Sequence, residues 1–80
     1  MRLDKFLKVS RIIKRRTVAN EACDQGRVSV NGRVAKASVD VKAGDVIEIR
    51  FGEKIFKVEI LNVADHVLKN DAADLYKVIL

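Results

Sequence analysis

The stretch RLDKFLKVSRIIKRR, residues 2–16, is the feature that most constrains this chain. It holds seven Lys or Arg residues and a single acid, yet Leu3, Phe6 and Leu7 keep the i, i+3, i+4 spacing of an amphipathic helix. One face of such a helix is buried in a core, while its basic flank stays outside. We therefore expect a helix over residues 2–10 that presents positive charge to a large anionic surface.

Positive charge is concentrated in the first half of the chain. Residues 1–36 contain ten Lys or Arg and three Asp or Glu, a net of +7, whereas residues 37–80 contain six and eight, a net of −2. Such a field attracts polyanions and releases their counterions on binding. This asymmetry indicates nucleic acid or an anionic membrane surface as the partner, because a merely solvated helix face would normally intersperse Glu among the Lys.

A second helix is predicted over residues 16–25. Small residues, with Cys23 among them, repeat the helical spacing there, and Gly26 follows as a stop signal. Between the two helices, Ile12 and Ile13 are expected to fill the core.

From residue 27 onward the apolar period changes to two. The segment RVSVNGRV, residues 27–34, predicts a hairpin in which Asn31 and Gly32 form a two-residue turn. The alternating segments 46–51 and 54–60 predict a second hairpin.

The segment NDAADLYKVI, residues 70–79, begins with residues that cap helices. We expect a short closing helix there, with Leu75 and Tyr76 docked inward. The expected fold class is therefore α+β, with two N-terminal helices packed on a small, mainly antiparallel sheet and a short C-terminal helix.

Length and composition favour one domain over residues 1–80, with a core motif at 1–52 and a closing strand and helix at 54–80. No apolar run approaches the roughly 20 residues of a membrane helix, and the N-terminus lacks the apolar core of a secretory signal. The single cysteine fits a reducing compartment. We expect a cytoplasmic protein that does not enter membranes.

Catalytic chemistry has little support in the sequence. His66 is the only histidine and has no second His or Cys at ligand spacing, so we interpret it as a plain surface residue. Cys23 lies on the inward face of its helix and is interpreted as a core residue rather than a nucleophile. No GxGxxG or GxxxxGK[ST] motif occurs. We expect neither an enzyme nor a metal or cofactor site.

The basic residues fit folded RNA better than unpaired bases. All four aromatic residues, Phe6, Phe51, Phe56 and Tyr76, fall on predicted core faces, which disfavours base stacking. Arg and Lys can instead grip phosphates and 2′-hydroxyls of folded RNA by shape. The candidate RNA-binding residues are Arg2, Lys5, Lys8, Arg11, Lys14, Arg15, Arg16, Arg27 and Arg33.

Five segments resemble the RNA-binding S4 domain family, in order, over residues 1 to about 52. They are RLDKFL followed by SR, then RRTVA, GRVSVNGRVAKAS and VKAGDVIEI. Within that family the chain is most similar to the short bacterial members of ribosome-associated quality control, a likeness that extends through RFGEK to AADLY. It is next most similar to the fifteen-kilodalton heat-shock proteins.

The resemblance implies a binding partner and a site. It implies binding to large ribosomal subunits obstructed by peptidyl-tRNA, contacts with large-subunit rRNA and the P-site tRNA, and support of an RqcH-type factor that adds a C-terminal alanine tail. It carries Arg2, Asp4 and Arg16 over as RNA-binding positions, although we interpret Asp4 as orienting basic side chains rather than touching RNA. The chain is expected to act as a monomer.

Arg15 departs from the family pattern. Many members have Ser or Thr at this position, where the hydroxyl can cap the second helix, whereas an arginine there opposes the helix dipole. A nearby RNA phosphate would make the same charge favourable, so we interpret Arg15 as a phosphate contact; the alternative is an exposed arginine at a frayed helix end.

Two other functions remain open. A general rRNA chaperone or assembly factor with the same fold would bind subunits whether or not they carry tRNA. A protein-interaction module that works through its acidic C-terminal half would bind with little dependence on salt.

Overall fold

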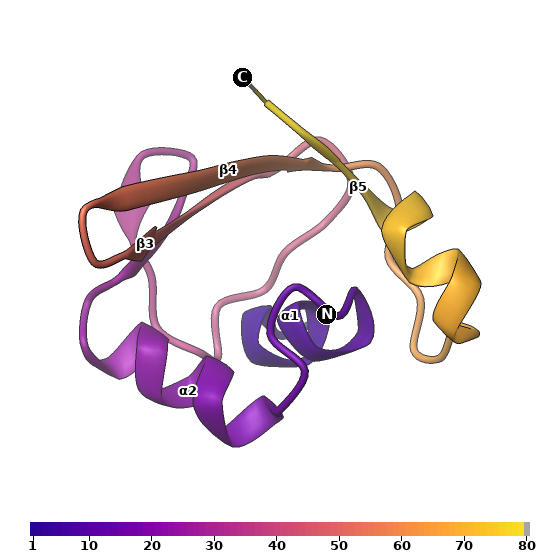
Figure 1. Cartoon of the computed structure of the whole chain (residues 1–80), viewed down its shortest axis with the longest axis horizontal. Coiled ribbons are helices and arrows are strands. Elements are labelled where there is room, and N and C mark those ends of the chain that lie inside the picture. Colours follow the sequence, from indigo (N-terminus) through magenta and orange to yellow (C-terminus); the bar gives the residue numbers. More distant parts are fainter. Residues whose placement is uncertain (80) are drawn as a thin grey trace.

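The computed structural model describes residues 1–79 and has an α+β fold, as expected (Figure 1). Leu80, the last residue of the expected closing segment, lies outside the described residues. Two helices lie on one side of a five-stranded antiparallel sheet with the strand order β2-β1-β3-β4-β5. The elements are α1 (Leu3–Val9), α2 (Arg16–Asp24), β1 (Val28–Val30), β2 (Arg33–Val34), β3 (Val46–Phe51), β4 (Lys54–Ile60), the 3-10 helix η1 (Lys69–Leu75) and β5 (Tyr76–Val78).

The core lies between the helices and the inner face of the sheet. The stripe predicted for α1 is buried there, and so are the small residues of α2 and the alternate residues of the central strands. Ile13 is buried and Ile12 packs against the core from the connection. Burial raises the pKa of the Cys23 thiol to about 11, with smaller contributions from Asp4 and Asp24, so the thiol stays protonated at neutral pH. The main core residues are Leu3, Phe6, Leu7, Ala19, Ala22, Cys23, Val28, Ile47, Ile49, Val58 and Ile60.

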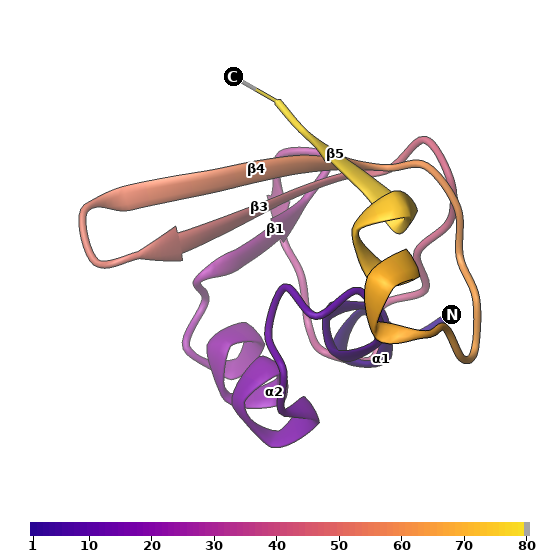
Figure 2. The same cartoon turned by 45° about the vertical axis from the view of Figure 1, so that its right-hand side comes forward.

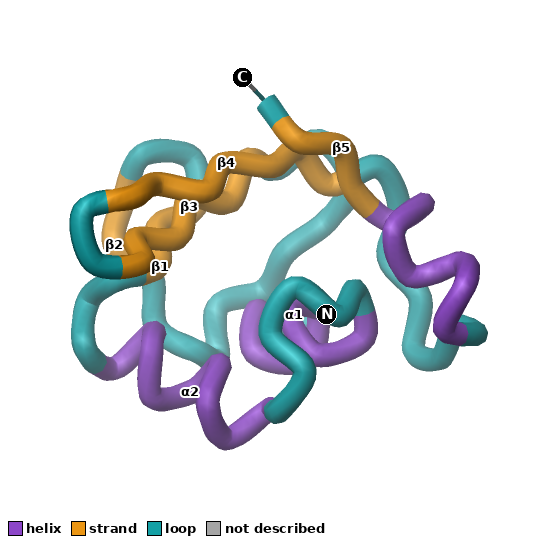
Figure 3. The backbone as a smooth tube through the Cα atoms, in the orientation of Figure 1, coloured by secondary structure: helices purple, strands orange, loops and turns teal. Residues whose placement is uncertain are grey.

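The long β2–β3 connection holds the start of α1. The first N–H groups of a helix have no partner within the helix, and here Leu3 N donates to Val39 O (2.8 Å) and Asp4 N donates to Ala37 O (3.1 Å). Figure 3 shows this connection as a loop that descends from the sheet, passes beside α1 and returns to the sheet. The N-terminus of α1 is therefore fixed by backbone from the middle of the chain.

Gly26 ends α2 as predicted. It has a φ of +73°, a left-handed conformation that glycine adopts without penalty. Its N–H donates to Cys23 O and the next N–H, from Arg27, donates to Ala22 O, both at 3.0 Å. This pair of hydrogen bonds is a Schellman motif. It provides donors for carbonyl groups that have no partner within the last turn of the helix.

The extent of the closing helix was predicted wrongly. A 3-10 helix is present, but it ends at Leu75, and Tyr76–Val78 form β5, which pairs with β4. The sequence YKVI alternates β-branched and aromatic residues with a polar one, a pattern that suits the open edge of β4 better than a helix. Figure 2 shows the chain leaving η1 and running along the sheet as β5. Leu75 is buried as expected, while Tyr76 is half-buried.

The prediction that all four aromatic residues face the core was wrong for Phe51. It is 44% exposed because it lies at the tip of the β3–β4 hairpin, beyond the cover of the helices. Phe6 is fully buried, and Phe56 packs edge-to-face on Tyr76 with ring centroids 6.4 Å apart. Among residues 1–79, no helix is long and apolar enough to cross a membrane.

The β1–β2 turn provides a test of the fold. Asn31 and Gly32 have φ values of +52° and +84°, as a two-residue hairpin turn requires. A Cβ atom added at Gly32 would meet no atom within 4 Å, so the cost that we expect from a substitution is backbone strain. We expect Gly32→Val to lower the free energy of unfolding by about 1–2 kcal/mol in chemical denaturation. Gly32→Asn is the control and should cost less, because Asn tolerates this conformation; equal stability of the Val variant and the parent would contradict the turn.

Candidate nucleic-acid interface

Asp4 is a buried acid in the first turn of α1 and joins the two N-terminal helices. Its side chain is 2% exposed. Arg2 donates to both carboxylate oxygens, from Nε to Oδ1 at 3.1 Å and from Nη2 to Oδ2 at 3.2 Å. From α2, Arg16 Nη2 donates to Oδ1 and Asn20 Nδ2 donates to Oδ2, both at 3.3 Å. The carboxylate therefore fixes two arginines that come from different parts of the chain.

The pKa of Asp4 reports the balance of these forces. Burial alone would raise the pKa, but the hydrogen bonds from Arg2, Arg16, Asn20 and the Lys5 backbone N–H outweigh it and lower the pKa to about 2. Asp4 thus stays ionised at every pH at which the protein would work. Its hydrogen bond also raises the pKa of Arg2 above the ordinary value.

Arg2 and Arg16 are held at the surface with their guanidinium groups half-exposed. Their side chains are 50% and 45% accessible, although both bond to a buried atom. Each guanidinium has five N–H donors in a planar fork, and Asp4 uses two donors of Arg2 and one of Arg16. The remaining donors can bind phosphate oxygens. Two guanidinium groups share one carboxylate, so the cluster carries a net charge of one positive unit.

Three other predicted residues surround a separate hollow. Lys8, Arg11 and Lys14 line it from the end of α1 and from the connection to α2. Lys5 instead pairs with Asp65, with Nζ and Oδ1 3.0 Å apart, so the C-terminal segment already occupies part of this basic flank.

The remaining predicted residues lie apart from these groups. Arg15 is the N-cap residue of α2, is exposed and makes no side-chain cap bond, so the helix begins without a capping hydroxyl. Arg33 is exposed on β2 at the edge of the sheet. Arg27 is half-buried before β1, and its Nε is buried without a hydrogen-bond partner among the described residues. The structure thus divides the nine predicted cations into several groups rather than one surface.

Sequence reasoning missed two contributors to these groups. Asn20 lies one helical turn after Arg16, and this i, i+4 spacing could have indicated that both side chains reach the same atom. His66, which we interpreted as a plain surface residue, lines the hollow beside Lys8. No local signal could have found it, since the two positions lie 58 positions apart in the sequence.

The Asp4 cluster makes stability depend on pH. A pKa of about 2 in the folded state, against about 3.9 when unfolded, corresponds to roughly 2–3 kcal/mol of stabilisation. Because the folded pKa is the lower one, this stabilisation is complete above pH 4 and is lost as the pH falls toward 2. We expect Asp4→Asn to lose about 2 kcal/mol at pH 7 and progressively less toward pH 2, as measured by denaturant unfolding. The exposed Asp74→Asn is the control; a penalty for Asp4→Asn that stays constant over this range would contradict the assignment.

The comparisons with known proteins agree with this architecture. The RQC P-site tRNA stabilizing factor of Halalkalibacterium halodurans is 63% identical over 78 residues, covering 98% of this chain and 89% of that protein. The Bacillus subtilis protein of the same name is 56% identical over 79 residues, covering 99% and 92%. The trimeric structure of Vibrio cholerae heat shock protein 15 matches with a TM-score of 0.90 and 32% identity, covering 99% of this chain and 81% of that one.

The family assignment follows from the sequence match itself. The model of the S4 domain matches residues 1–47, which include α1, α2 and the β1–β2 hairpin. Both arginines that bond to Asp4 fall within the matched region. The chain belongs to the S4 domain family.

Proposed function

We propose that this chain is an RNA-binding factor of ribosome-associated quality control, and not an enzyme. It binds large ribosomal subunits obstructed by peptidyl-tRNA, contacts rRNA and the P-site tRNA, and supports C-terminal alanine tailing by an RqcH-type factor. Residues 1–80 act as one cytoplasmic RNA-binding unit, as a monomer. The names of its relatives, RQC P-site tRNA stabilizing factors at 63% and 56% identity, support this role.

The observation that carries the proposal is the shared carboxylate of Asp4. RNA recognition by shape needs donors held at fixed positions, because every side chain that must be ordered on binding costs conformational entropy. Arg2 and Arg16 are ordered before binding, since both bond to the same buried acid. Arg15 is the N-cap residue of α2, where an RNA phosphate would compensate for the unfavourable position of its charge at the helix N-terminus.

The same contacts change how the proposal must be tested. Surface arginines can usually be removed with little effect on folding. Here, Arg2→Ala or Arg16→Ala would leave the buried carboxylate of Asp4 with fewer partners, so lost stability would be confused with lost binding. Lysine keeps a positive charge near Asp4 but cannot present a planar fork. The informative variants are therefore Arg2→Lys and Arg16→Lys.

The alternatives predict different partners. A general rRNA chaperone would bind empty and tRNA-bearing large subunits alike. A protein-interaction module would keep its affinity at raised salt, whereas a protein that contacts several phosphates loses orders of magnitude. The half-exposed guanidinium groups of Arg2 and Arg16 favour RNA as the partner, and the relatives' names favour tRNA-bearing subunits.

The test is co-sedimentation with large subunits that are either empty or carry peptidyl-tRNA, over a range of salt concentrations. We expect the parent to prefer the tRNA-bearing subunits and to lose affinity steeply with salt. The double variant Arg2→Lys/Arg16→Lys should bind about tenfold more weakly, although its net charge is unchanged.

Arg50→Lys on β3 is the matched control, because it makes the same exchange away from the Asp4 cluster. Circular dichroism at the assay temperature verifies that each variant is folded. A folded double variant that binds like the parent at every salt concentration would refute the proposed RNA surface, and equal binding to both kinds of subunit would favour the general rRNA chaperone.

A further inference from the structure

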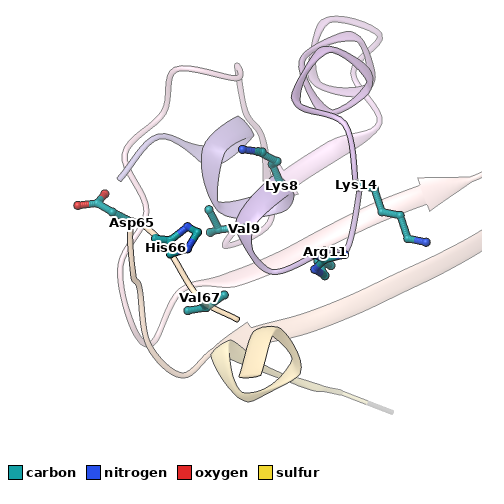
Figure 4. Close-up of a pocket in the computed structure, with 7 residues that line it drawn as sticks. All are labelled: Lys8, Val9, Arg11, Lys14, Asp65, His66 and Val67. Atoms are coloured by element: carbon teal, nitrogen blue, oxygen red, sulfur yellow. The ribbon is translucent and has the colours of Figure 1, made fainter. Parts of the chain in front are cut away.

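A basic pocket lies where the chain leaves α1 and meets the C-terminal segment. Its volume is about 190 Å³, and it is lined by Lys8, Val9, Arg11, Lys14, Asp65, His66 and Val67. Figure 4 shows these side chains around the pocket, with His66 near Lys8 and Val9. We call this hollow the basic pocket; it is separate from the Asp4 cluster, because the two share no residue.

The electrostatics of the basic pocket favour an anion. Three cations line it, and the acid at its rim, Asp65, is engaged elsewhere by its bond to Lys5. Figure 4 shows the Asp65 carboxylate directed away from the rest of the pocket, on the side opposite Lys14. Lys5, and more weakly the amino terminus, hold the pKa of Asp65 below its usual range. Among residues 1–79, no ion pair joins Lys8, Arg11 or Lys14 to an acid.

The backbone of Arg11 adopts a conformation that is unfavourable for a residue with a side chain. Its φ of +61° is left-handed, and the position directly after a helix C-cap is one that glycine usually occupies. The turn is well bonded, since Arg11 N donates to Lys8 O and Ile13 N donates to Leu7 O. An arginine in this conformation is strained by comparison with glycine, which indicates that its side chain has a use.

The size of the basic pocket limits its ligand. Pockets that enclose drug-sized molecules span about 300–1,000 Å³, so 190 Å³ suits a small group rather than a whole nucleotide. A phosphodiester matches the charge of the lining cations and the imidazole. We propose that the basic pocket binds one phosphodiester group of the RNA, with Lys8, Arg11 and Lys14 as its cations and His66 adding a further positive charge when protonated. This inference rests on the proposed RNA-binding function and adds a second, pH-sensitive contact to it.

His66 makes this contact testable, because it is the only histidine in the chain. Protonation adds a positive charge to an imidazole, whereas phosphodiesters and carboxylates keep their charge between about pH 8 and 6. The charged groups that line the pocket with His66 are Lys8 from α1, Arg11 and Lys14 from the connection, and Asp65 from its own segment. Lys14 lies on the far side of the pocket from His66 (Figure 4). A bound phosphodiester favours the imidazolium, so affinity for RNA should rise as the pH falls from 8 to 6.

The first experiment locates the site with dimethyl phosphate, a single phosphodiester of constant charge. Heteronuclear NMR of the parent should show saturable shifts of the His66 ring and of the Arg11 and Lys14 amides, with Lys69 on η1 unaffected. Shifts of equal size at Lys69, or none at His66, would overturn the proposal. This result does not depend on Arg2 or Arg16, so it separates a failure of the basic pocket from a failure of the proposed function.

The second experiment measures affinity for tRNA-bearing large subunits at pH 6 and pH 8. The parent should bind about two- to fivefold more tightly at pH 6, the range for an exposed ion pair, and His66→Gln should remove this difference. Lys14→Gln should weaken binding at both pH values more than the control Lys69→Gln, which removes the same charge outside the pocket. A His66→Gln variant with the full pH response would overturn the role of the imidazole.

Arg11→Gly separates a binding role from a structural one. Glycine suits the left-handed backbone, so the variant should be at least as stable as the parent in thermal unfolding. Its affinity should nevertheless fall about two- to fivefold, because one cation of the pocket is lost. Affinity equal to that of the parent would overturn the assignment of Arg11.

Discussion

The carboxylate of Asp4 is the interaction on which the arrangement of the basic surface depends. It is buried at the junction of α1 and α2, and it accepts hydrogen bonds from Arg2, Arg16 and Asn20. A buried charge is tolerated only when its partners are in place, so the same bonds that keep Asp4 ionised also order the two arginines. The one acid among the seven cations of residues 2–16 thus joins the two N-terminal helices.

The sheet serves this surface by holding α1 in position. Loop carbonyls from the β2–β3 connection bond to the start of α1, and the apolar stripe of the helix is fully buried against the sheet. The C-terminal half contributes as well, since Asp65 binds Lys5 and His66 lines the basic pocket. Its acidic balance therefore does not require a separate binding function: at least one of its acids organises the basic flank.

The features of the fold that depend on local sequence patterns could be predicted from the sequence. The buried stripe of α1, the stop at Gly26 and the Asn31-Gly32 turn all follow from periodicity and backbone preference, and the structure has them. The errors arose where a neighbour decides the outcome. Tyr76 belongs to a strand because the edge of β4 is open beside it, and Phe51 is exposed because the hairpin extends past the helices. The basic residues were predicted as one set, but their division between the Asp4 cluster and the basic pocket depends on long-range contacts.

The most direct test of the account is the RNA affinity of Asp4→Asn. This change removes an acid from a surface that binds a polyanion and raises the net charge from +5 by one, so charge alone would strengthen binding. We expect weaker binding instead, because the guanidinium groups of Arg2 and Arg16 lose the anion that orders them. At a temperature where circular dichroism shows the variant to be folded, its affinity for tRNA-bearing large subunits should be about tenfold weaker than that of the parent. Equal or tighter binding would contradict the claim that the Asp4 carboxylate organises the RNA surface.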